Sequence, residues 1–134
     1  MKKLMMSALL LGGMASSSAF GETVFVTLEK DNALAVVDAA QGKLIKTVKI
    51  GKRPRGIVLS KDQRQLYVAA SDDNTIQVID TESLKVVGKL PSGEDPETFA
   101  RDPEGRFLYV SNEDDNQVTV IQMAYNKDVK TVHV

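Results

Sequence analysis

The chain has 134 residues, with 17 Lys and Arg against 18 Asp and Glu, a formal net charge of −1, and no cysteine. This balance gives no strongly basic surface, so it excludes the charge pattern typical of nucleic-acid-binding domains. Without cysteine there is neither a disulfide nor a thiolate nucleophile. The fold must therefore be held by packing of its hydrophobic residues, which make up 43% of the chain.

The first residues have the pattern of a secretory signal peptide. Two lysines precede an apolar run at residues 4–14, and small residues follow up to Gly21. The run is shorter than the roughly 20 residues that a membrane-spanning helix needs. We expect residues 1–19 to form the signal, with cleavage after Ala19 or Gly21. The mature protein is then expected in the periplasm or outside the cell, with no membrane span.

A repeat of 42 residues fills the rest of the chain. Leu66-Tyr67-Val68 recurs as Leu108-Tyr109-Val110, and the asparagines at 32, 74 and 116 keep the same spacing. Units of this length, built from short apolar runs, are typical of four-stranded propeller blades. We divide the chain into repeat 1 at 23–64, repeat 2 at 65–106 and a partial repeat 3 at 107–134.

Each repeat predicts short β-strands separated by turns. The apolar runs are rich in Val, Tyr and Phe, and Ile76 and Val78 alternate with Gln77, as on a strand with one buried face. Acidic residues followed by Asn close hairpins, because Asn tolerates positive φ. No helical period occurs after residue 20. We expect strands at 23–28, 33–37, 44–49, 56–60, 66–70, 75–79, 85–90, 98–102, 107–111, 117–121 and 129–134.

The phase of the repeat predicts how these strands group into sheets. The first group lacks its inner strand, and two complete four-stranded antiparallel groups follow. We therefore expect an all-β fold: a partial β-propeller of about three blades and a fragment of a larger ring, since propellers close with four to eight blades. Open strand edges and blade faces also predict self-association of the chain when it is expressed alone.

Several motifs resemble the repeat of YVTN-family β-propeller proteins. These are Ile76-x-Val78-Ile79-Asp80, Gly93-x-x-Pro96 and the hairpin at 102–106. More narrowly, residues 53–57, 92–97 and 112–115 are similar to stretches of exported propellers associated with pyrroloquinoline-quinone-dependent alcohol catabolism. This resemblance implies a seven-bladed, non-catalytic periplasmic protein that accompanies quinoprotein dehydrogenases.

Two positions depart from the repeat. Gln63 stands where its copy is Gly105, and Gln122 stands where the earlier copies are Asp38 and Asp80. Gly supports the left-handed backbone that tight hairpins use, and Asp supports turns through its carboxylate. These departures place the hairpin at Gln63 and the turn after Gln122 in doubt.

Charged loops predict a binding rim. In a propeller, the turns between the second and third strands of a blade and the connections between blades emerge on the same face. The basic connection could hold an anionic ligand or partner through Arg–carboxylate pairing, or it could be a solvated loop. The acidic turns could bind a hard cation, or serve only as turns; we expect no metal site. The candidate rim residues are Lys52, Arg53, Arg55, Asp73, Glu113, Asp114 and Asp115.

The sequence predicts no catalytic residues and no cofactor. His133 is the only histidine and falls in an outer-strand position, so an acid–base pair has no second member. We expect an exported, non-catalytic binding or scaffold module for a periplasmic protein or small molecule. The alternative is a fragment of a propeller enzyme or cofactor domain, lactonase-like or haem-d1-domain-like, with its catalytic residues on further blades.

Overall fold

The computed structural model describes residues 22–125 and 127–134, and the predicted signal peptide lies outside these residues. The described residues contain β-strands and two short 3-10 turns, η3 at Glu29–Asp31 and η4 at Ser71–Asp73. No helix in this part of the chain has the length and apolar character needed to cross a membrane. The prediction of an all-β fold is confirmed.

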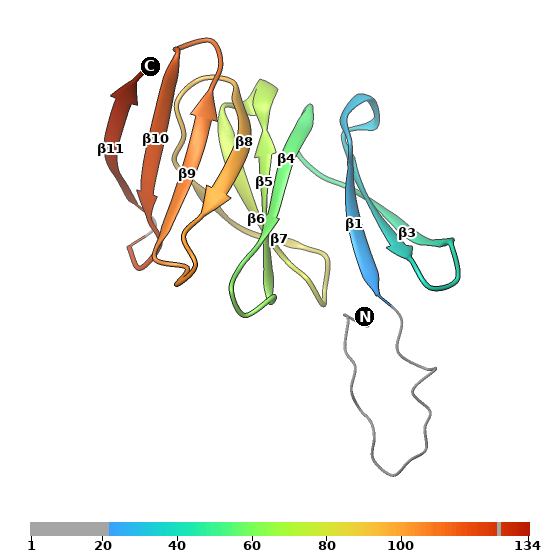
Figure 1. The fold of residues 1–134 in the computed structure, drawn as a ribbon. Coiled ribbons are helices and arrows are strands. Elements are labelled where there is room, and N and C mark those ends of the chain that lie inside the picture. Colours follow the sequence, from blue (N-terminus) through green and yellow to red (C-terminus); the bar gives the residue numbers. More distant parts are fainter. Residues whose placement is uncertain (1–21, 126) are drawn as a thin grey trace.

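The strands form three antiparallel sheets that stand side by side as consecutive blades (Figure 1). Each sheet follows chain order, so each is a simple meander. Blade 1 has three strands, and blades 2 and 3 have four each, as predicted. Blade 1 consists of β1 (Thr23–Leu28), β2 (Ala33–Asp38) and β3 (Lys43–Lys49); blade 2 of β4 (Pro54–Leu59), β5 (Gln65–Ala70), β6 (Thr75–Asp80) and β7 (Val86–Leu90); blade 3 of β8 (Pro96–Arg101), β9 (Phe107–Asn112), β10 (Gln117–Gln122) and β11 (Lys127–His133).

The strand bounds differ most from the prediction at β4, β8 and β11, which each begin two residues earlier than expected. Pro54 pairs with Ala70, and Pro96 pairs with Asn112, each across an irregularity in register. A proline can begin a strand because it lacks only the donor. The bulges also recur at the repeat spacing, at Val36/Val37, Val78/Ile79 and Val120/Ile121.

One turn of each blade contains an asparagine with a left-handed backbone. In blades 2 and 3 this turn joins the second and third strands, and in blade 1 it is the equivalent turn between β1 and β2. Asn32, Asn74 and Asn116 have φ values of 52°, 49° and 51°. Asn adopts this conformation more readily than most residues because its short polar side chain bonds locally. The prediction that these asparagines close the hairpins is confirmed.

The hairpin at Gln63 also forms, despite the departure from glycine. Gln63 takes φ 62°, close to the 73° of Gly105. Its N–H donates to the Ser60 carbonyl at 2.9 Å, and Asp62 Oδ1 accepts from Ser60 Oγ at 2.7 Å. These local bonds offset the cost of a left-handed non-glycine residue. The turn after Gln122 includes residue 126, which lies outside the described residues.

The core lies between blades, because alternate residues of each strand face opposite neighbours. On β5, Leu66 and Val68 join Leu34 in a cluster between blades 1 and 2. Tyr67, one residue along, joins Leu108 and other side chains of blade 3 in a second cluster. Blade 2 is therefore buried on both faces, and it fixes the positions of its two neighbours.

The inner strands β4 and β8 approach closely at Gly56. A Cβ added there would lie 2.8 Å from Thr98 Cα and closer still to the Glu97 carbonyl oxygen. Only glycine permits this separation of the two backbones. The approach brings the first residues of β4 and β8 together at one end of the blades.

Candidate functional site

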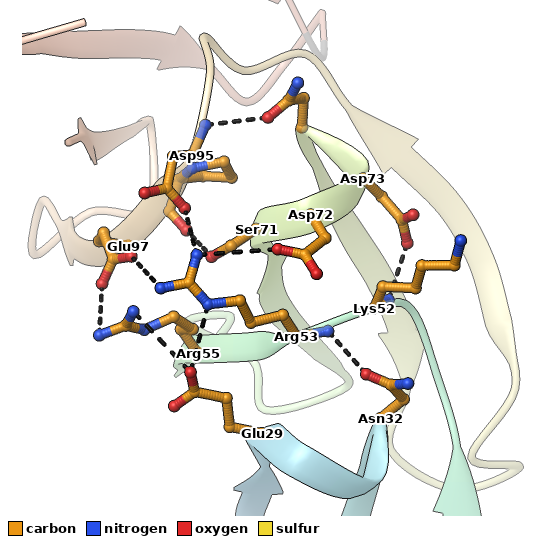
Figure 2. Close-up of polar contacts among 12 residues, drawn as sticks. Glu29, Asn32, Lys52, Arg53, Arg55, Ser71, Asp72, Asp73, Asp95 and Glu97 are labelled. Atoms are coloured by element: carbon orange, nitrogen blue, oxygen red, sulfur yellow. Dashed lines mark hydrogen bonds and ion pairs between the residues drawn. The ribbon is translucent and has the colours of Figure 1, made fainter. Parts of the chain in front are cut away.

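The connection from blade 1 to blade 2 is bound to turns of both blades. The Lys52 N–H donates to Asp73 Oδ2 of blade 2 at 2.8 Å. The next residue, Arg53, donates its N–H to Asn32 Oδ1 of blade 1, also at 2.8 Å. Side chains of the two turns therefore hold this connection from opposite sides (Figure 2).

The same arrangement recurs one repeat later. The Glu94 N–H donates to Asp115 Oδ2 at 3.1 Å, and the Asp95 N–H donates to Asn74 Oδ1 at 2.9 Å. We call this pair of hydrogen bonds the connection clamp. It explains Asp73 and Asp115 as structural acceptors for backbone donors, a role that the sequence did not distinguish from ligand binding.

The clamped residues Arg53 and Asp95 have left-handed backbones, with φ values of 50° and 45°. Residues other than glycine rarely adopt this conformation, and it persists where surrounding structure enforces it. The clamp supplies that enforcement. As a result, the two side chains leave their connections in fixed directions and meet: Arg53 Nη1 lies 3.1 Å from Asp95 Oδ1.

Arg53 is the centre of a charged cluster that spans all three blades (Figure 2). Besides Asp95, its guanidinium contacts Glu29 at 3.2 Å, Asp72 at 3.7 Å and Glu97 at 3.9 Å. The hydrogen bond to Glu29 is the main cause that raises the pKa of Arg53, and the carboxylates of Asp95, Glu97 and Asp72 act in the same direction. The guanidinium is thus committed to partners within the chain.

Glu97 is one of the two least exposed acids of the cluster, with a side chain that is 15% exposed beside Asp95 at 13%. Its Oε2 pairs with Arg55 Nη2 at 2.8 Å. Its Oε1 is buried and accepts no hydrogen bond from any described residue. Burial raises the pKa of Glu97, and Arg55 opposes this by lowering it.

A third carboxylate, Glu113, stands beside Asp95 and Glu97. Oxygens of these three residues all lie within 4.8 Å of one another. Carboxylates at this spacing could contact a hard cation or a protonated amine. Arg53 and Arg55 already pair with two of them, whereas within the described chain Glu113 has no basic partner.

Carboxylates outnumber guanidiniums in this cluster, which we call the charged rim. The rim is therefore acidic, although its connection was identified in the sequence by its basic residues. Its members are Glu29, Arg53, Arg55, Asp72, Asp95, Glu97 and Glu113.

Of the residues expected at this rim, Arg53, Arg55 and Glu113 lie in the cluster. Asp73 and Asp115 serve the connection clamp. The Lys52 side chain is exposed, with only its backbone N–H in the clamp, and Asp114 is an exposed turn residue. The structure thus brings the predicted residues to one end of the blades but gives them different roles.

Four rim residues were missed by the sequence reasoning: Glu29, Asp72, Asp95 and Glu97. A signal for two of them was present. Asp95 occupies the repeat position of Arg53, and Glu97 occupies that of Arg55. Equivalent positions of consecutive blades therefore carry opposite charges, and each lies beside its counterpart because adjacent inner strands pack together.

Comparison with known structures supports the propeller arrangement. Hydrazine synthase of Kuenenia stuttgartiensis is 21% identical and superposes with a TM-score of 0.77, over 84% of this chain and 32% of that one. Dihydro-heme d1 dehydrogenase NirN, in complex with DHE, is 21% identical with a TM-score of 0.67, over 82% and 24%. A candidate 6-phosphogluconolactonase of Bacteroides fragilis is 23% identical with a TM-score of 0.71, over 82% and 35%.

These likenesses are below 25% identity and show the fold alone. The chain spans between 24% and 35% of the length of these structures. No curated protein matches the chain.

The family model described as "Lactonase, 7-bladed beta-propeller" matches residues 23–130, which include nearly all of the three blades. The described strands of the chain supply three blades of this architecture. The chain belongs to the lactonase family of seven-bladed β-propellers.

Proposed function

We propose that this chain is a binding module of an exported, non-catalytic β-propeller, and that its charged rim binds a positively charged group of a protein or small-molecule partner. The observation that carries this proposal is the composition of the rim. Arg53 and Arg55 are paired with carboxylates of the chain itself. The remaining charge is negative and is centred on Glu113. A cationic partner would be attracted to this end of the blades, and an anionic one would be repelled.

The position of the rim favours binding at this end. The connection clamp holds the rim backbone in place, so little conformational freedom is lost when a partner binds. The Oε1 of Glu97 has a 3.9 Å ion pair with Arg53 Nη2 but accepts no hydrogen bond from a described residue. A protonated amine reaching it would gain a charge-assisted hydrogen bond.

The cellular setting belongs to the same proposal. The basic start and short apolar run of the N-terminus favour export to the periplasm. The narrower resemblance of residues 53–57, 92–97 and 112–115 to exported propellers of pyrroloquinoline-quinone-dependent alcohol catabolism favours a role beside quinoprotein dehydrogenases in alcohol oxidation. The partner is then a periplasmic protein or small molecule of that oxidative pathway.

Charge discrimination tests the proposal directly. Fluorescence anisotropy with a labelled tetralysine peptide and a labelled tetraglutamate peptide would measure both affinities for the full chain at low salt. We expect tetralysine to bind, its affinity to fall as salt is added, and tetraglutamate not to bind. Equal binding of both peptides would overturn the proposal.

Two variants locate the binding. The double substitution E97Q/E113Q should weaken tetralysine binding by about fivefold, in line with two partly exposed ionic contacts. The control is E104Q, because Glu104 pairs with Lys61 at 3.1 Å at the opposite end of the inner strands. A loss in E104Q equal to that in E97Q/E113Q would show that binding follows overall charge and not the rim.

A second candidate function, hydrolysis of a lactone by a completed ring, is favoured by the family and by the state of Glu97. Burial raises the pKa of this carboxyl, which moves it toward the range useful for general acid–base catalysis. Titration of the acid released from gluconolactone would distinguish the two candidates. Turnover above the uncatalysed rate that E97Q abolishes would favour the enzyme, and turnover unchanged by E97Q would count against Glu97 as its catalytic acid.

A further inference from the structure

A pocket of about 490 Å³ lies between blades 2 and 3, at the end opposite to the charged rim. Its volume is within the range of small-molecule sites. Arg101 at the end of β8, Tyr67, Leu108 and Met123 line it. Because β4 and β8 run from the rim to this end, roughly 20 Å of strand separates the two sites.

Arg101 breaks the repeat at this pocket. The equivalent residue of blade 2 is Leu59, one repeat earlier in the sequence. Leu59 packs against the apolar cluster between blades 1 and 2 that contains Leu34 and Leu66. At the same place between blades 2 and 3, the chain has a guanidinium instead of an apolar side chain. The comparison of the two blades shows that a leucine is sufficient for packing at this position. The arginine of blade 3 therefore needs another explanation.

No ion pair is seen between the guanidinium of Arg101 and a described residue. Its Nη1 donates to the Asp102 carbonyl oxygen at 3.3 Å. Its Nε is buried, and no described residue accepts a hydrogen bond from it. A buried donor of a charged group that lacks an acceptor costs stability, so this arrangement needs a reason other than packing.

The other charged side chains of the pocket have polar partners, in one case an ion pair and in the other hydrogen bonds from neutral donors. Lys61 Nζ lies 3.1 Å from Glu104 Oε2. Asp62 Oδ1 accepts from Ser60 Oγ at 2.7 Å and from the Arg64 N–H at 3.0 Å. Among the described residues that line this pocket, Arg101 and Asp62 have no printed ion pair, and only Arg101 also keeps a buried polar atom without a hydrogen bond.

We propose that this pocket binds a small organic carboxylate, with the carboxylate paired to the guanidinium of Arg101. Because Nε is buried, the carboxylate pairs with the terminal Nη nitrogens, which can donate charge-assisted hydrogen bonds to it. The body of the ligand contacts Met123 and the Tyr67 ring, which keep some exposure, whereas Leu108 is fully buried. Two polar groups also line the pocket: the Tyr67 hydroxyl donates to Gln65 Oε1 at 3.3 Å.

Benzoate and its neutral isostere benzamide test the proposal on the full chain. Two-dimensional NMR would follow the Arg101 Nε–H and the Met123 methyl during titration with each compound. We expect saturable shifts of both signals with benzoate and at least about tenfold weaker binding of benzamide, because a charged hydrogen-bond pair is lost. Equal responses to the two compounds, or shifts confined to other residues, would overturn the proposal.

Two variants separate recognition from folding. R101L restores the residue that the repeat uses at Leu59, so it should fold at least as well as the parent chain while losing about tenfold or more in benzoate affinity. R64Q removes an exposed arginine near the same end as a matched control and should leave the affinity unchanged. Unchanged benzoate affinity in R101L would refute the assignment, and the titration of the parent chain decides the matter if R101L does not fold.

Discussion

Replacement of Gly56 by alanine tests how the inner strands are brought together. The new Cβ would lie 2.8 Å from Thr98 Cα, whereas ordinary contacts of this kind begin at 3.4 Å. The Glu97 carbonyl oxygen is closer still, and both neighbours are backbone atoms of another blade. The strands β4 and β8 must therefore separate by roughly 0.6 Å or more, and overpacking of this kind costs about 1–3 kcal/mol.

We expect G56A to lower the free energy of unfolding by about 2–3 kcal/mol, at the upper end of that range, because no flexible side chain can move aside. Urea unfolding followed by far-UV circular dichroism would measure it. The matched control is G88A on β7, where the nearest atom, Val78 Cβ, lies at 3.9 Å. G88A should be neutral or stabilising by up to about 1 kcal/mol. A G56A variant within about 0.5 kcal/mol of the parent chain would refute the close approach of the inner strands.

Three further predictions concern the clamp, the rim and the open blade face. N74A should destabilise the chain by about 1–2 kcal/mol in the same unfolding assay, because it loses the bond to the Asp95 N–H and the tolerance for φ 49°. E97Q should gain stability relative to the parent chain as pH rises from about 4 to about 7. Burial raises the pKa of Glu97, so the folded state favours the protonated acid and loses stability as that proton leaves. Y109K should reduce self-association in sedimentation velocity. Tyr109 is 38% exposed, whereas its repeat counterpart Tyr67 is 7% exposed between blades 2 and 3, so we propose that Tyr109 contacts blade 1 of a second copy.

Each of these three predictions would be contradicted by a different result. N116A is the control for the clamp, since Asn116 shares the left-handed backbone, and no described residue is seen to bond to its side chain. Equal losses in N74A and N116A would remove the clamp as a stabilising element. A stability difference between E97Q and the parent chain that does not change with pH would contradict the raised pKa of Glu97. A parent chain that stays monomeric at all concentrations would contradict association through Tyr109.

The fold was predictable because the physical requirements of a blade repeat along the chain. Turn residues such as Asn74 recur where a left-handed backbone is needed, and apolar positions such as Leu66 and Leu108 recur where blades pack. Each of these signals is local in sequence and depends little on which residues of a neighbouring blade pack against it. The spacing of the repeat then fixed which strands share a sheet.

The rim was predicted only in its location. The pairing of Arg53 with Asp95 depends on the contact between two inner strands. The two residues occupy the same repeat position but carry opposite charges. A search for identical residues across repeats therefore passes over it. Arg101 was missed for the same reason, because its meaning comes from the contrast with Leu59 and from a buried Nε that only three-dimensional packing reveals.

The sign of the charged rim is the central claim, and R53A tests it most directly. This substitution removes the guanidinium that pairs with Asp95 and Glu29. Labelled tetralysine and tetraglutamate would be titrated into the parent chain and into R53A at equal ionic strength. We predict severalfold tighter tetralysine binding by R53A, because its carboxylates are no longer neutralised, and no tetraglutamate binding by either protein. Binding of tetraglutamate by the parent chain that R53A abolishes would contradict the account and assign the rim to an anionic partner.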